Sequence, residues 1–238
     1  MKKVTYLENN GFIVTTDDVI MVFDDLRDPA HALHHTLDAN PEKPVVFFVS
    51  HHHHNEHLNK SIFELAQNHQ RTYVMANQYF PQNVPDSLQV AGMSHGDVIE
   101  DLPGGLKVKA YESAGCGVSF LVTTKDGEKI YHAGEMVIDP KYDGKADHKG
   151  KKPVSVDLII QRVAAENPTI DIAFFPVDPE TGENCTKDAA TFLSAIDVKD
   201  FFPMHIHGDI KKACDFASYA PARTKCHCEH TPGKSVEL

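Results

Sequence analysis

The chain has 238 residues, of which 41% are hydrophobic and 24% are charged, a balance that suits one sizeable domain with a full core. Lysine and arginine number 23 against 34 aspartates and glutamates, which gives a net charge of −11. Such an acidic chain argues against nucleic acid or an anionic membrane as the partner.

Neither a membrane span nor a secretion signal is expected. No apolar run approaches the roughly 18 residues that a membrane helix requires, and the opening "MKKVTYLENNGF" lacks the apolar stretch and cleavage site of a signal peptide. The five cysteines are odd in number and mostly scattered, which favours reduced thiols over a disulfide framework. We therefore expect a cytoplasmic protein.

The first part of the chain predicts strands and one βαβ unit. Runs of β-branched and aromatic residues between turn signals predict strands over 3–8, 11–16 and 19–25. Residues 28–43 follow as a helix or a loop. The unbroken apolar run 45–49 predicts a strand that is buried on both faces. A helix with Asn55 as N-cap is then expected to run to Ala66, and the buried run 72–76 completes the unit.

The rest of the chain predicts four more strands and then two helix–strand pairs. The strands are expected over 96–101, 106–112, 117–124 and 128–134. A helix over 154–166, a strand over 171–177, a helix over 186–196 and a strand over 199–205 follow. This order favours an α/β (α+β) sandwich of two sheets with helices on the outside, formed as a single domain over 1–238.

Between strand 45–49 and the expected helix lies the sequence "HHHHNEH", residues 51–57. Because side chains at i and i+2 of an extended segment point the same way, His52 and His54 could face one metal ion. Glu56 and His57, at the helix start, could turn toward a neighbouring ion. The alternative is a solvated polar loop, but four ligand-type side chains at this spacing favour metal binding.

The pattern H-x-H-x-E-H after a buried strand resembles the H-x-H-x-D-H signature of the metallo-β-lactamase-fold hydrolases. Other segments match in order: "GFIVTTDDVIMVFDD", which ends near Asp24, then "GVSFLVTTKDGEKIYHAGEM" and "FFPMHIHGD". "YHAG" and "PMH" are most similar to the branch that includes the ascorbate-phosphate lactonases. The resemblance implies a four-layer αββα sandwich of two mixed β-sheets with helices on the outer faces.

The resemblance also implies a ligand set for one or two divalent metal ions, with zinc as the first choice and manganese or iron as alternatives. The implied ligands are His52 and His54 in the first site, Glu56, His57 and His205 in the second, and Glu135 in the bridging position. Both family aspartates are glutamates here, which affects metal spacing and preference. The family histidine before "GVSF" is missing, so Glu112 is the nearest substitute ligand and Cys116 the softer alternative.

Several other polar residues could also contribute to the site. The resemblance also makes Glu56 the candidate general base, because it matches the family Asp that orients the attacking water. His132 has two predicted roles. Either it orients a ligand carboxylate and is then a catalytic candidate together with Glu56, or it is a hydrogen-bonded histidine at a strand end. Asp178 either contacts a ligand or caps a turn, and His207 is either a proton donor or an exposed polar residue. A solvated surface is favoured for His31, His34, His35 and for "CHCEH" at 226–230, where no second cysteine pair completes a structural zinc site.

These features predict a metal-dependent hydrolase that uses a metal-activated water on a small ester, lactone or phosphoester. The alternative is a metal-binding protein without hydrolytic activity, motivated by the missing first-site histidine. A redox role on two irons is a third, weaker hypothesis. The expected partner is a small-molecule substrate, with no nucleic acid and no membrane, and homo-oligomer formation is left open.

Overall fold

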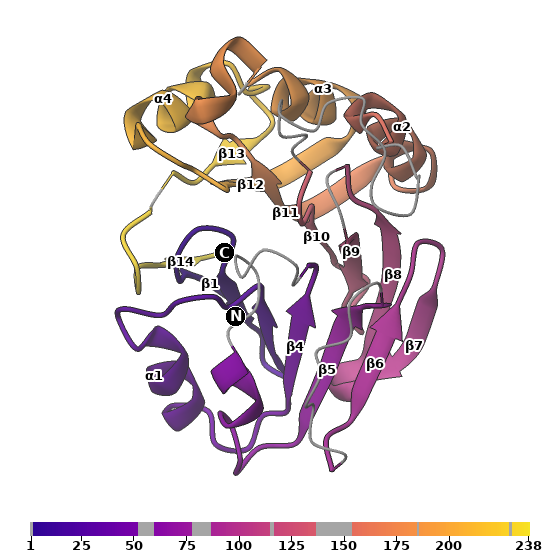
Figure 1. Cartoon of the computed structure of the whole chain (residues 1–238), viewed down its shortest axis with the longest axis vertical. Helices are drawn as coiled ribbons and strands as arrows, with labels where there is room; N and C mark the ends of the chain where they lie inside the picture. Colours follow the sequence, from indigo (N-terminus) through magenta and orange to yellow (C-terminus); the bar gives the residue numbers. More distant parts are fainter. Residues whose placement is uncertain are drawn as a thin grey trace.

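The computed structural model describes residues 2–51, 60–77, 87–114, 117–136, 154–184, 186–228 and 230–238. Two sheets of seven strands face each other, with α1 (Ala32–Asp38) outside the first sheet and α2 (Val156–Glu166), α3 (Lys187–Ala195) and α4 (Ile210–Asp215) on the side of the second (Figure 1). This is the αββα sandwich of two mixed sheets that the sequence predicted.

The first sheet runs in the order β14, β1, β2, β3, β4, β5, β6. Its strands span Ser235–Glu237, Lys3–Tyr6, Phe12–Thr15, Ile20–Phe23, Val45–Val49, Arg71–Ala76 and Val90–Met93. Strands β3 to β6 are parallel neighbours. In β4, Phe47 packs toward α1 while Phe48 packs between the two sheets, so both faces of the strand are covered. This double burial explains why its sequence is apolar without alternation.

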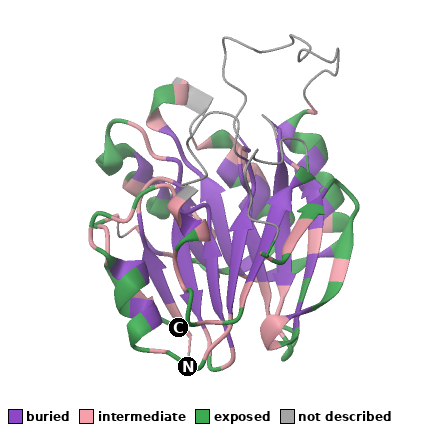
Figure 2. Ribbon diagram, turned by 60° about the horizontal axis from the view of Figure 1, so that its bottom comes forward, coloured by how far each residue is buried: buried purple, intermediate pink, exposed green. Residues whose placement is uncertain are grey.

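The second sheet runs in the order β13, β12, β11, β10, β9, β8, β7. Its strands span Lys225–Cys226, Asp197–Met204, Thr169–Pro176, Lys129–His132, Val118–Thr123, Leu106–Glu112 and Val98–Leu102. Strands β10 to β13 are parallel neighbours. Exposed residues gather on the helices and loops, and the strands of the two sheets are mostly buried (Figure 2).

Local capping explains where the principal helices begin. The Asp28 carboxylate accepts the N–H groups of Ala32 (2.8 Å) and Leu33 (2.7 Å) at the start of α1. The Ser155 hydroxyl accepts the N–H of Leu158 at 3.3 Å in the first turn of α2. Both side chains satisfy backbone donors that have no partner within the helix. Short 3₁₀ turns cover Lys60–Phe63 (η1), Pro103–Gly105 (η3), Pro179–Asn184 (η4) and Phe216–Ser218 (η5).

Two features of the structure differ from the sequence predictions. Of the helix expected up to Ala66, the described part contains only the 3₁₀ turn η1, and its expected start lies outside the described residues. Cys214 and Cys228 form a disulfide with a Cα–Cα separation of 5.4 Å, so reduced thiols are the wrong expectation for this pair. Within the described segments, no helix is long and apolar enough to cross a membrane.

The strand directions define one chemically important edge. Because β1 is antiparallel to β2 and to β14, both termini lie at the edge where the parallel strands begin. The carboxyl ends of β3 and β4, and those of β10, β11 and β12, therefore meet at the opposite edge, beside the β1–β2 turn. Loops at the carboxyl ends of parallel strands are where α/β folds place their functional groups.

Candidate metal centre

A buried carboxylate anchors the end of β4, where the histidine run begins. The Asp24 side chain, fully buried after β3, accepts the Ser50 N–H at Oδ1 (2.7 Å) and the Ser50 hydroxyl at Oδ2 (2.5 Å). Asp24 also donates its own N–H to the Phe48 carbonyl at 2.9 Å. Hydrogen bonds to a buried carboxylate are among the stronger ones in proteins, so Asp24 fixes the direction in which the chain leaves β4.

Ser50 also joins the two sheets. Its carbonyl accepts the N–H of Val118, the first residue of β9, at 3.0 Å. Gly117, just before β9, has φ +73°, and a Cβ at this position would lie 2.0 Å from the Ser50 oxygen. At Gly134, after β10, a Cβ would lie 2.6 Å from the Val118 oxygen and 2.9 Å from the Ser50 Cβ. Close backbone approach therefore requires glycine at both positions.

His132 belongs to this buried layer. It is 0% exposed and stacks on Phe23 with ring centroids 5.3 Å apart. Its Nε2 lies 3.0 Å from the Asn10 carbonyl oxygen, and its Nδ1 lies 3.3 Å from the Gly134 N–H. Since the Asn10 carbonyl can only accept, Nε2 of His132 carries a proton. His132 is therefore a hydrogen-bonded histidine at a strand end, which is one of its two predicted roles, and its Nδ1 lies 3.8 Å from the Asp24 carboxylate. A role of His132 in catalysis stays a prediction.

Above this layer, the ends of β10, β11 and β12 bring four polar side chains together. Ligand atoms of Asp178, His205 and His207 all lie within 4.8 Å of one another. Asp178 Oδ2 is 3.2 Å from His205 Nδ1 and 2.9 Å from His207 Nδ1. On the other side of its ring, His205 Nε2 lies 3.5 Å from Glu135 Oε1. The two nitrogens of His205 therefore face two different carboxylates.

The donor set and its spacing fit a divalent metal ion. Each Nδ1–H donates to Asp178, which leaves Nε2 of a neutral ring as the metal-binding nitrogen. Ligand atoms that surround an ion tetrahedrally at about 2.0–2.2 Å are roughly 3.3–3.5 Å apart. The 3.5 Å between His205 Nε2 and Glu135 Oε1 is long for a hydrogen bond but matches this spacing. These two residues therefore suit a metal site, with Asp178 as the outer carboxylate that orients His205.

The backbone of His205 is held in an uncommon conformation. Its φ is +54°, in the left-handed region that non-glycine residues rarely occupy, and its side chain is 7% exposed. Its N–H donates to the Asn9 carbonyl in the β1–β2 turn at 3.3 Å. Strained conformations persist where the surrounding structure determines them, and they cluster at functional sites. The first sheet thus helps to position a side chain that the second sheet supplies.

Asp178 stays ionised through its neighbours. Burial alone would raise the pKa of Asp178, but hydrogen bonds from the His205 ring, the His207 ring and the Glu180 N–H hold this pKa well below its usual value. Its Oδ1 accepts the N–H groups of Glu180 (3.0 Å) and His207 (3.3 Å). A carboxylate is thereby kept as the acceptor for two imidazoles.

The structure places only some of the predicted site residues. It brings Glu135 and His205 together, while His52, His54, Glu56, His57 and Cys116 lie outside the described residues. Glu112, at the end of β8, pairs instead with the guanidinium of Arg162 on α2. Its predicted co-ligands His52 and His54 lie outside the described residues, so its assignment as the substitute ligand stays a prediction.

Two side chains contribute more than the sequence indicates. Sequence reasoning favours a turn cap for Asp178 and an exposed surface for His207. Asp178 caps the turn after β11 by accepting the Glu180 N–H, and it also holds the His207 ring at the candidate centre. Their positions in the sequence could have indicated this contact, because both residues follow strands of the same sheet at its carboxyl edge. His31, His34 and His35 are exposed on or beside α1, as the sequence predicted.

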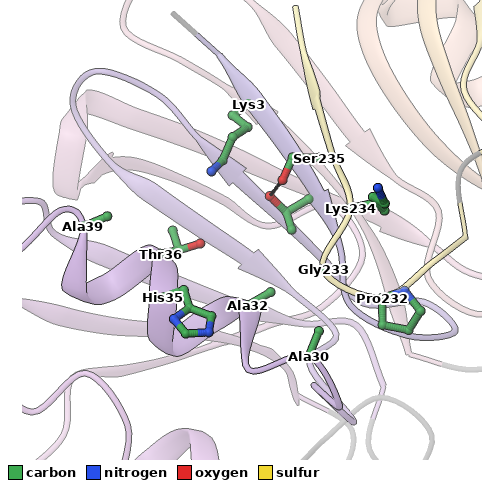
Figure 3. A pocket seen from close by; sticks show the side chains of 11 residues that line it. Lys3, Ala30, Ala32, His35, Thr36, Ala39, Pro232, Gly233, Lys234 and Ser235 are labelled. Carbon is green, nitrogen blue, oxygen red and sulfur yellow. Dashed lines mark hydrogen bonds between the residues drawn. The ribbon is translucent and has the colours of Figure 1, made fainter.

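A cavity of about 350 Å³ lies away from these residues, between α1 and the β1–β14 pair (Figure 3). Its lining includes Lys3, His35 and Lys234, and Thr5 is hydrogen-bonded to Ser235 at 2.9 Å along one wall. None of the predicted ligands lines it. The donor groups, rather than this cavity, therefore define the candidate site.

Comparison with known proteins identifies the fold. No protein-family model matches the sequence, and no curated protein matches it. The structure is similar to Igni18, a metallo hydrolase from the archaeon Ignicoccus hospitalis, with a TM-score of 0.68 and 16% identity over 99% of this chain and 97% of that one. It is also similar to the metallo-β-lactamase fold protein YhfI from Bacillus subtilis, with a TM-score of 0.65 and 10% identity over 100% of both chains.

A third similarity involves a different activity. CmlA, a diiron β-hydroxylase from Streptomyces venezuelae, matches with a TM-score of 0.53 and 9% identity over 92% of this chain and 50% of that one. Identities this low establish the fold and leave the reaction to be argued from the site. The chain has the metallo-β-lactamase fold, as its sequence motifs predicted, and its structural neighbours include metal-dependent hydrolases.

Asp178→Asn is expected to weaken metal binding at this centre by about 10- to 100-fold, because an amide cannot serve as the charged acceptor for both imidazoles. Competition between the protein and a chelating dye measures the affinity. The matched control is Asp38→Asn at an exposed position on α1, where the affinity should not change. An unchanged affinity in Asp178→Asn would show that His205 does not need this carboxylate.

Asp25, next to the anchoring aspartate, predicts a pH-dependent stability. Burial, aided by the charge of Asp28, raises the pKa of Asp25 from 3.8 to about 6. The folded state thus holds this proton more tightly than the unfolded chain, and folding loses stability as pH rises from about 4 to about 6, by roughly 3 kcal/mol. Asp25→Asn should therefore raise the free energy of unfolding above pH 6 and lose this advantage below pH 4. Urea unfolding at pH 4 and pH 7.5 measures both, and an equal effect at the two pH values would contradict the shift.

Proposed function

We propose that this protein is a metal-dependent hydrolase that acts on a small ester, lactone or phosphoester. The observation that carries the proposal is the convergence of Glu135, Asp178 and His205 at the edge where the histidine run begins after β4. The metallo-hydrolase named among the structural neighbours supports the same class of reaction.

The proposed ligands combine this cluster with the residues that the motif resemblance supplies. His52 and His54 would hold one ion, and Glu56, His57 and His205 the other, with Glu135 between them. We propose zinc, with manganese or iron as alternatives, because imidazole and carboxylate donors suit all three. When bound, the metal supplies a water with its pKa lowered toward about 7 and polarises the substrate oxygen.

The described residues have distinct tasks in this proposal. Asp178 orients the His205 ring and fixes its proton on Nδ1. The His207 side chain is 38% exposed and is held through Nδ1 by the same carboxylate, so it is placed to give a proton to a leaving oxygen once its Nε2 also carries one. Glu56 remains the predicted general base. The buried pair of Asp24 and Ser50 keeps the edge rigid beneath them.

The net charge of −11 favours a small substrate over a large polyanion. We therefore propose a small-molecule substrate, without a nucleic-acid or membrane partner. Location in the cytoplasm stays a prediction from the sequence. Homo-oligomer formation and the resemblance to the lactonase branch remain predictions from the sequence.

One observation favours the alternative of a metal-binding protein without turnover. Glu112, the nearest substitute for the missing first-site histidine, is engaged by Arg162. A first site that lacks a third ligand would bind its ion weakly, and a single remaining ion would support fewer hydrolytic steps.

Metal content and turnover measured on one preparation discriminate the two candidates. Under the proposed function, protein purified without added metal carries about two ions at the strand-end centre and hydrolyses at least one member of a panel of ester, lactone and phosphoester substrates. Chelation should abolish turnover, and zinc or manganese should restore it. One ion or none, with no turnover on the panel after metal is added back, would establish the non-hydrolytic alternative.

A further inference from the structure

A second cluster of metal-binding groups lies outside the candidate centre. Cys214 belongs to α4, whereas Cys228 and His230 lie in the segment that connects β13 to β14. Their ligand atoms all lie within 4.8 Å of one another, and all three residues are partly buried. Sequence reasoning finds no partner cysteine for "CHCEH", and the structure supplies one from α4.

The composition of the cluster goes beyond what a disulfide requires. Two cysteines with Cα atoms 5.4 Å apart are enough for the bridge that Cys214 and Cys228 form. An imidazole within reach of both sulfurs completes a Cys₂His donor set, which is a typical set for tetrahedral zinc. Cys226 is different, because it is a free cysteine that packs against the hydrophobic core.

We propose that Cys214, Cys228 and His230 form a thiolate-based binding site for zinc or a similar soft divalent ion, and that the Cys214–Cys228 disulfide is the oxidised, metal-free form of the same site. The two states exclude each other, because a sulfur that is bonded to sulfur is no longer a thiolate ligand. The fourth position on the ion would be open to water or to another ligand.

The interconversion balances with a small-molecule disulfide as the oxidant. The two thiolates together lose two electrons and form the S–S bond, and the metal ion is released. The small disulfide takes up the two electrons and two protons from water, and yields two small thiols. Reduction by a dithiol reverses the step, and the metal binds again as the cysteine protons are lost.

This site would join three segments that meet near the candidate centre. Helix α4 begins shortly after His207, so Cys214 ties the loop that carries the centre's histidines to the C-terminal segment. The His230 ring packs edge-on against Tyr6 at 5.0 Å, and the Tyr6 hydroxyl accepts the Asn9 N–H at 2.8 Å. The Asn9 carbonyl in turn accepts the His205 N–H. The proposal itself does not depend on hydrolytic activity, because metal binding is its readout.

Cobalt(II) provides the direct test on the unmodified chain, since thiolate ligands give it a strong near-ultraviolet absorption. The protein is reduced with a phosphine, stripped of metal and then given cobalt(II). It should show this band and bind about one more ion per chain than protein that was oxidised with a small disulfide and treated in the same way. The oxidised form should have two fewer free thiols, and a dithiol should restore the band. A reduced chain without the band, or with the same metal content as the oxidised chain, would overturn the proposal.

Three variants and one control locate the site. Cys214→Ser and Cys228→Ser should each lose the extra ion and the thiolate band. Cys226→Ser is the matched control, two positions before Cys228, and should retain both. His230→Ala should keep the disulfide in the oxidised form but weaken metal binding in the reduced form by at least about 10-fold. Far-ultraviolet circular dichroism verifies folding. A band that persists in both Cys214→Ser and Cys228→Ser would assign it to another cysteine and refute this site.

Discussion

His205→Ala is expected to lower hydrolytic turnover by at least about 100-fold and to remove an ion from the strand-end centre. The imidazole lies between Glu135 and Asp178, at 3.5 Å and 3.2 Å. Its loss removes a proposed metal ligand and leaves Asp178 without the ring that it orients. Turnover on the responsive substrate and metal per chain are measured on the same sample.

Two further variants separate the loss of a ligand from the loss of folding. His205→Asn keeps a residue type that tolerates the left-handed backbone at φ +54° but removes the imidazole, so it should lose metal while it remains folded. His34→Ala, at an exposed position on α1, should leave turnover and metal content unchanged. If His205→Asn retains both the metal and the activity, His205 is not a ligand and the proposed centre is wrong.

Gly117→Ala is expected to lower the free energy of unfolding by about 2–5 kcal/mol. The left-handed backbone costs an alanine about 1–2 kcal/mol, and overpacking adds about 1–3 kcal/mol. The overlap is severe here, because the new Cβ would lie 2.0 Å from the Ser50 carbonyl oxygen, which cannot rotate away as a side chain would. Urea unfolding measures the change.

Gly127→Ala is the matched control for this prediction. Gly127, in the turn between β9 and β10, has a similar φ of +85°, but no atom lies within 4 Å of the position that a Cβ would take there. Gly127→Ala should therefore lower the free energy of unfolding only by the cost of a left-handed backbone at alanine, about 1–2 kcal/mol. Equal losses at Gly117 and Gly127 would mean that the close approach of β9 to Ser50 does not constrain the edge of the sheets.

Gly117→Ala should also reduce metal content, whereas Gly127→Ala should not. The Ser50 carbonyl that the alanine would displace is followed directly by His51 and the histidine run, and Ser50 is itself held by Asp24. A variant that is destabilised but keeps full metal content would show that the position of this edge does not control the centre.

The sequence by itself determined the layers and their order. The run 45–49 is apolar without alternation because Phe47 and Phe48 are buried on opposite faces of β4. A strand that is buried on both faces indicates a sheet with helices on its outer side and a second sheet on its inner side. Long periodic segments such as α2 also follow from local pattern and capping. The elements β6, β13, β14 and α4 were not expected, because they lack the runs of β-branched and aromatic residues, or the helical repeat of apolar residues, that reveal the other elements.

The pairing of Glu135 with His205 was within reach of the sequence, because motif resemblance assigns both to strand ends at one edge. Only the tertiary structure decided what surrounds them. His132 is fixed by Asn10, which is 122 positions away, and Glu112 is engaged by Arg162, which is 50 positions away. Likewise Cys214 finds Cys228 and His230 only once α4 packs beside the segment after β13. Sequence patterns specify which face of an element is buried, whereas contacts across two sheets depend on how separate elements pack together, which no local pattern contains.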